Sequence, residues 1–215
     1  MCALGTGWSM RLLVDDNAVT LDRPTLAAAI AAGAAHAESR GRIVVEIKAD
    51  GVTLAERDIE SAPDVPGTFK EVELLTASKA ELGASVLEAA ASALSDLATA
   101  QRFVADQILA SKLEPAMEAM KEVLGVWQGV RDGADQVCSL LGTDLPTLGE
   151  RAGMRAAAGE IIPRTTATLA EVMRCVQAQD WSALADVMEE DLCGLANAWQ
   201  DLLGVIARHL NAESR

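Results

Sequence analysis

The spacing of apolar residues changes near residue 76. Before this point, alternating segments such as Ile43, Val45 and Ile47 favour β-strands around one Ala-rich helix. From Ser78 onward, apolar residues recur at the three- and four-residue intervals of amphipathic helices. The sequence therefore predicts an α+β fold, with a small sheet-containing module at residues 10–76 and a helical domain at residues 77–215.

The N-terminal module is predicted to hold two hairpin turns and one helix. The first turn is Asp15-Asp16-Asn17, between two short strands. A helix is expected to begin near Pro24 and Thr25, because Pro and Thr suit helix starts, and to end near Gly41. The other predicted elements are a strand at residues 43–48, a turn at Asp50-Gly51, a short strand at residues 52–54, an irregular segment at residues 60–68 and a last strand at residues 69–75.

Four long segments of the helical domain carry apolar stripes. The first is expected to begin at the capping box Ser78-Lys79-Ala80-Glu81, and Pro115 marks the start of the second. The third is expected to begin near Glu160, and Asp180 is expected to cap the last. Residues 143–159 are predicted as a loop with a short helix. Long helices joined by short connections favour an antiparallel four-helix bundle.

The element order over residues 10–76 resembles the β-grasp arrangement of ubiquitin-like domains. In that arrangement one helix packs diagonally on a mixed sheet, and a two-layer ββαββ sandwich is the alternative. The chain as a whole resembles uncharacterised bacterial proteins with a ubiquitin-like N-terminal module followed by a helical bundle, most of all from Asp180 to Trp199. The resemblance implies no activity and no catalytic residue.

The composition of the chain limits the classes of partner that we expect. The 215 residues are 50% apolar and carry a net charge of −14, which both modules share. Without a basic stripe, the electrostatic attraction to nucleic acid is missing, and an acidic surface disfavours anionic membranes. No apolar run is long enough to cross a bilayer. We therefore expect a cytoplasmic protein whose partner is another protein or a second copy. Residues 1–9 are predicted to be a disordered extension, and Met10 is an alternative translation start.

Neither a catalytic motif nor a cofactor motif stands out. Neither His36 nor His209 has a Glu three residues before it, as in the helical di-iron sites. We expect no catalytic residue, no cofactor and no metal. The cysteines form no CxxC pair and are predicted to be small apolar residues of the interior: Cys2, Cys138, Cys175 and Cys193.

The last helix carries the candidate interaction residues, Val187 and Val205. They are 18 residues apart, so on a regular helix they project at the same angle, about 60° beyond the main apolar stripe. The edge they form must be covered by a neighbouring helix, by the N-terminal module or by a partner. The preferred hypothesis is a non-enzymatic adaptor or chaperone-like bundle whose client is unknown. The alternative is an enzyme with a small-ligand site between the modules, near the Gly149–Gly159 segment.

Overall fold

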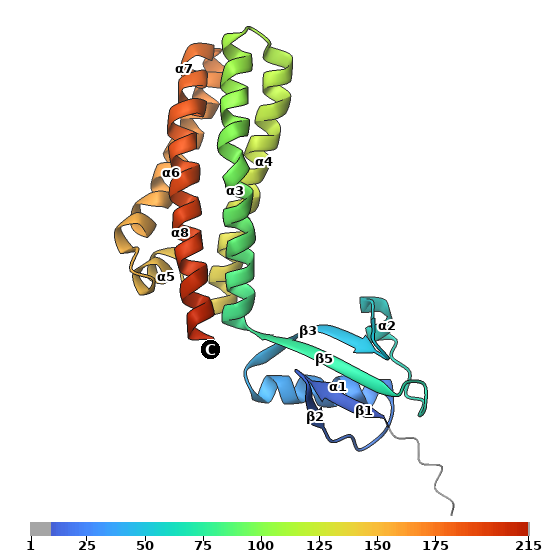
Figure 1. Ribbon diagram of the computed structural model, residues 1–215. Helices are drawn as coiled ribbons and strands as arrows, with labels where there is room; N and C mark the ends of the chain where they lie inside the picture. Colours follow the sequence, from blue (N-terminus) through green and yellow to red (C-terminus); the bar gives the residue numbers. More distant parts are fainter. Residues whose placement is uncertain (1–9, 215) are drawn as a thin grey trace, which may run out of the picture. The chain divides into compact units, whose positions relative to one another are not determined.

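The computed structural model describes residues 10–214 and divides into two compact units between Lys79 and Ala80 (Figure 1). Unit 1 contains a five-stranded mixed sheet with a helix on one face. Unit 2 contains helices and their connections, with no strand among its described residues. The α+β class expected from the sequence is confirmed. Residues 1–9, which include Cys2 and were predicted to be a disordered extension, lie outside the described residues.

The sheet of unit 1 has the strand order β2-β1-β5-β3-β4. Its central strand, β5, pairs in parallel with β1 and antiparallel with β3. Both predicted hairpin turns are confirmed, because Asp15 and Asp16 close the first and Asp50 and Gly51 the second, all four with positive φ. The strands are β1 (Arg11–Val14), β2 (Asn17–Val19), β3 (Arg42–Ala49), β4 (Val52–Thr53) and β5 (Glu71–Ser78).

Helix α1 (Leu26–Ser39) packs on one face of this sheet. Its start is confirmed, because the Thr25 hydroxyl accepts a hydrogen bond from the Ala28 N–H at 3.3 Å. Gly33 allows the helix to approach β5, since a Cβ at this position would overlap with the side chain of Leu74. The core between helix and sheet contains Leu12, Val14, Leu26, Ala29, Ile47, Val72 and Leu74.

Two boundaries of unit 1 differ from the sequence prediction. A short helix, α2 (Glu56–Glu60), precedes the irregular segment. Strand β5 runs on to Ser78, where it passes directly into helix α3 (Lys79–Leu109). The apolar alternation stops at Leu75, but β3 continues alongside and its Arg42 pairs with Ser78. The neighbouring strand therefore extends β5 beyond its own sequence pattern.

The long helices of unit 2 lie side by side (Figure 1). Helix α3 contacts α4 where Gly83 meets Val137, and contacts α8 where Cys193 meets the Ala98 carbonyl. Helix α6 packs against α8. None of the described helices is long and apolar enough to cross a membrane. The remaining elements are α4 (Leu113–Leu141), α5 (Leu145–Arg151), α6 (Arg155–Ala178), α7 (Trp181–Asp186), a π-helix η1 (Val187–Asp191) and α8 (Leu192–Glu213).

The final helix is not the uniform α-helix that the sequence predicted. Its predicted cap is confirmed, because the Asp180 carboxylate accepts from the Ala183 N–H at 3.2 Å. The π-helix η1 then interrupts it, and a π-helix turns through a smaller angle per residue. The equal projection of Val187 and Val205, derived for a regular helix, therefore does not hold. Val187 is buried in the core of unit 2, whereas Val205 is half-buried.

Candidate functional site

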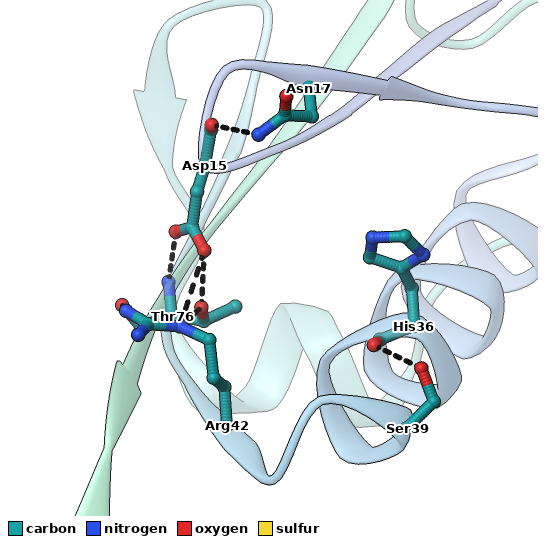
Figure 2. A network of polar contacts seen from close by, with 6 residues as sticks. All are labelled: Asp15, Asn17, His36, Ser39, Arg42 and Thr76. Carbon is teal, nitrogen blue, oxygen red and sulfur yellow. Dashed lines mark hydrogen bonds and ion pairs between the residues drawn. The ribbon is translucent and has the colours of Figure 1, made fainter. Parts of the chain in front are cut away.

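Unit 1 contains a polar network that joins the β1–β2 turn to β3 and β5 (Figure 2). The Asp15 carboxylate accepts the backbone N–H of Thr76 at 2.8 Å and also the Thr76 hydroxyl. Arg42 donates from Nε to Thr76 Oγ1 at 2.6 Å and from Nη2 to the Thr76 carbonyl at 2.8 Å. The Arg42 Nε atom lies 3.5 Å from Asp15 Oδ2. Three segments distant in sequence are thereby held together.

This network supports the fold of unit 1 and offers no acid–base pair. Partial burial raises the pKa of Asp15, but the Thr76 hydrogen bonds and the charges of Arg42 and Arg40 outweigh it, so the pKa falls below its ordinary value. The carboxylate therefore stays ionised at neutral pH. His36 stands apart from it in Figure 2, and its buried Nε2 has no hydrogen-bond partner within residues 10–214. The only contact drawn for His36 is its backbone carbonyl, which accepts from the Ser39 hydroxyl.

The thiols of unit 2 are poor nucleophiles. Burial raises the pKa of Cys138, Cys175 and Cys193, which favours the protonated thiol. The Cys193 thiol faces two backbone carbonyls, at 3.5 and 3.6 Å, and no imidazole. His209 lies near Glu213, with Nε2 at 3.2 Å from Oε1. Across residues 10–214, no three His, Cys, Asp or Glu side chains gather as a metal site.

The strongest candidate site is a groove between α4 and α6, which we call the α4–α6 groove. It consists of two neighbouring hollows of about 350 and 40 Å³ that share Arg131. The principal lining residues are Leu124, Trp127 and Arg131 of α4 and Ile162, Thr165 and Leu169 of α6.

The walls of the α4–α6 groove differ in character. On α6, Ile162, Leu169 and Met173 follow helical spacing along one face, and Met173 is 62% exposed. On α4, Arg131 is exposed and makes no hydrogen bond or ion pair with any described residue. Trp127 is 1% exposed, and its indole N–H has no acceptor within the described chain. The groove therefore combines an apolar row, exposed at Ile162 and Met173 and half-buried at Leu169, with two donors that have no partner among the described residues.

A second hollow, of about 620 Å³, lies between α3 and α8 within unit 2; we call it the α3–α8 hollow. It brings Val205 together with Met154, which belongs to the Gly149–Gly159 segment. Val187 is not among its lining residues. Ser92, Gln200, Asp201 and Arg208 supply its polar groups, none of which bonds to another described residue. Val205 and the Gly149–Gly159 segment, which the sequence analysis treated separately, thus meet in the α3–α8 hollow.

Sequence analysis missed the principal polar residues of both units. Asp15 was predicted only as a turn residue, and Arg131 was not singled out. Gln101 was also missed: it is fully buried on α3, and neither its amide nitrogen nor its oxygen has a partner among the described residues. A signal for Gln101 was present, because it falls on the stripe of Leu94, Leu97, Val104 and Ile108. Arg131 follows Trp127 by one helical turn, which is a weaker signal.

Comparison with known proteins gives no further assignment at this point. No family model, no curated protein and no solved structure matches the chain.

Proposed function

We propose that this protein is a non-enzymatic adaptor or chaperone-like protein that holds a helix of a client protein in the α4–α6 groove. The observation that carries the proposal is the apolar row along α6, in which Ile162 and Met173 are exposed and Leu169 is half-buried and lines the larger hollow. Apolar side chains left at the surface next to a hollow are typical of binding grooves. The acidic composition favours a cytoplasmic setting.

The proposal includes a finer description of the fold. The mixed sheet with α1 on one face supports a β-grasp identity for unit 1, and the neighbouring long helices support an antiparallel four-helix bundle for unit 2. On this view the chain belongs with the uncharacterised bacterial proteins that share this pair of modules.

The length of the groove favours a helix as its occupant. On α4 the lining runs from Leu124 to Asp135, and on α6 the apolar row runs from Ile162 to Met173. Each spans about 16 Å at 1.5 Å per residue, or about three helical turns. A helix laid along such a groove contacts both walls with side chains at the i, i+3, i+4 and i+7 positions.

A site-specific cross-linker tests this function. A photoreactive amino acid at Met173, incorporated in the cells that make the protein, should capture a defined client protein. The same group at the exposed Glu190 of η1 should not capture it. With the client in hand, Leu169→Asp should abolish binding, whereas Ala167→Asp, with the same charge change on an exposed position of α6, should preserve it. Equal binding by both variants would contradict the proposal.

A small-ligand site is the second candidate function, and the α3–α8 hollow is the observation that favours it. The hollow includes Met154 of the Gly149–Gly159 segment, a carboxylate on Asp201 and a guanidinium on Arg208. Its described lining contains neither His nor Cys, so it suits binding better than nucleophilic catalysis. A thermal-shift screen of small metabolites against wild type and Arg208→Ala tests this alternative: a ligand that stabilises only the wild type supports it.

A further inference from the structure

We infer that the helix held in the α4–α6 groove carries an Asp or Glu side chain within its apolar face, and that Arg131 binds this carboxylate. The inference rests on the proposed function and names the chemistry of the client. It is carried by three features of the groove: the position of Arg131, the absence of any partner for it, and the unpaired N–H of Trp127.

Arg131 is the charge that lies nearest the floor of the groove. With about 100° of rotation per residue, Arg131 is displaced about 40° around α4 from the buried Trp127. Asp135 is displaced about 80° and Asp132 about 140°, so both carboxylates point further toward solvent. Arg131 also lines both hollows, whereas each aspartate lines one. A side chain that reaches the floor of the groove therefore lies beside the helix position of Arg131 and further from those of the two acids.

Trp127, one helical turn before Arg131, carries a second donor. Trp199, whose ring lines the smaller hollow, donates its indole N–H to Thr165 Oγ1 at 2.8 Å. Trp127, which lines the larger hollow, has no such acceptor. A buried donor without an acceptor is unfavourable. A carboxylate has two oxygens, so one can accept from the guanidinium, and the other can accept from Trp127 where binding opens a path to the buried indole nitrogen.

A neutral client helix would fit this groove less well. Its apolar face would cover Leu124 and Leu169 but would also remove Arg131 from water without giving it a partner. Burial of an unpaired charge is costly, whereas a charge-assisted hydrogen bond gains strength where water is excluded. Arg131 therefore selects against client helices that lack an acid at this position.

Two synthetic amphipathic peptides of about four helical turns test the inference. They are identical except that one has Glu and the other Gln in the middle of the apolar face. We expect the Glu peptide to bind the full-length wild type about tenfold more tightly, the lower end of coupling between close charge pairs. Arg131→Gln should remove this difference. Lys121→Gln also removes one positive charge from an exposed position of α4 and should retain this difference.

The outcomes separate the inference from the proposed function. Equal affinity of both peptides for the wild type, with binding lost in Leu169→Asp, would overturn the role of Arg131 and leave the groove function standing. A Glu preference that persists in Arg131→Gln would also overturn it. Binding unaffected by Leu169→Asp, or no saturable binding of either peptide, would contradict the groove function and the inference together. Trp127→Phe should weaken binding of the Glu peptide more than binding of the Gln peptide. The reverse order would mean that the carboxylate does not accept a hydrogen bond from Trp127.

Discussion

Trp199 and Thr165 form a buried hydrogen bond between α8 and α6, with the indole nitrogen 2.8 Å from Thr165 Oγ1. Thr165 is satisfied in turn, because its hydroxyl donates to the Ile161 carbonyl at 2.7 Å. Trp127 is buried to the same degree, yet its N–H has no acceptor among the residues that the structure describes. The two tryptophans therefore form a matched pair that differs in one hydrogen bond.

Replacement of each tryptophan by Phe removes the same atoms from the core. Trp199→Phe should destabilise unit 2 by about 1 kcal/mol more than Trp127→Phe, because only the former also loses a hydrogen bond. Urea unfolding followed by far-ultraviolet circular dichroism measures both. Equal losses of unfolding free energy would mean that the bond to Thr165 contributes no net stability.

Gln101 is a polar side chain within the apolar core of unit 2. Its side chain is fully buried with both polar atoms unpaired, so Gln101→Leu should raise the unfolding free energy by about 1–3 kcal/mol. Gln136→Leu makes the same change at an exposed position of α4 and should alter stability by less than about 0.5 kcal/mol. Thermal unfolding of the two variants tests this, and a destabilised Gln101→Leu would show that Gln101 has a partner such as a buried water.

Gly149 lets α5 pack tightly against α6. A Cβ at this position would overlap with the Cβ of Ala158, so Gly149→Ala should destabilise the protein by about 1–3 kcal/mol. Gly159 is the control, because a Cβ there meets nothing within 4 Å. Gly159→Ala should stabilise α6 by up to about 1 kcal/mol through helix propensity. Melting temperatures that rise for both variants would contradict the close approach of α5 and α6.

Asp15 makes the stability of unit 1 dependent on pH. Its pKa is lowered in the folded state, so its contribution is complete above the ordinary value of 3.8 and is lost as pH falls through the lower folded pKa. Asp15→Asn suits the positive φ and should speed hydrogen exchange in β1, β3 and β5 at neutral pH.

At low pH, Asp15→Asn should cause little loss of protection from hydrogen exchange beyond that of the wild type. As acid protonates Asp15, the exchange rates of wild type and Asp15→Asn should converge below about pH 4. Asp22→Asn, an exposed aspartate of the same unit, should match the wild type at neutral pH. A constant difference between wild type and Asp15→Asn at every pH would assign the effect to lost geometry instead of charge.

Local signals in the sequence were sufficient for most elements. The turns at Asp15 and Asp50, the cap at Thr25 and the cap at Asp180 are confirmed because each depends on residues within one turn of the chain. The predictions failed where a neighbour in space decided the outcome. Strand β5 continues to Ser78 because β3 pairs with it, and η1 breaks the phase between Val187 and Val205 inside an unbroken apolar stripe.

The sequence by itself determined the α+β class, the change from strands to helices near residue 76 and most helix ends, because hydrophobic period and capping act over a few residues. Only the tertiary structure decided that Thr165 accepts from Trp199, that Asp15 is held by Thr76 and Arg42, and that Arg131 and the Trp127 N–H have no partner in the part of the chain that the structure describes. These pairings join residues 34 to 61 positions apart, or depend on the absence of a partner. The distance between two side chains on different elements is set by how those elements pack, and no local pattern encodes it.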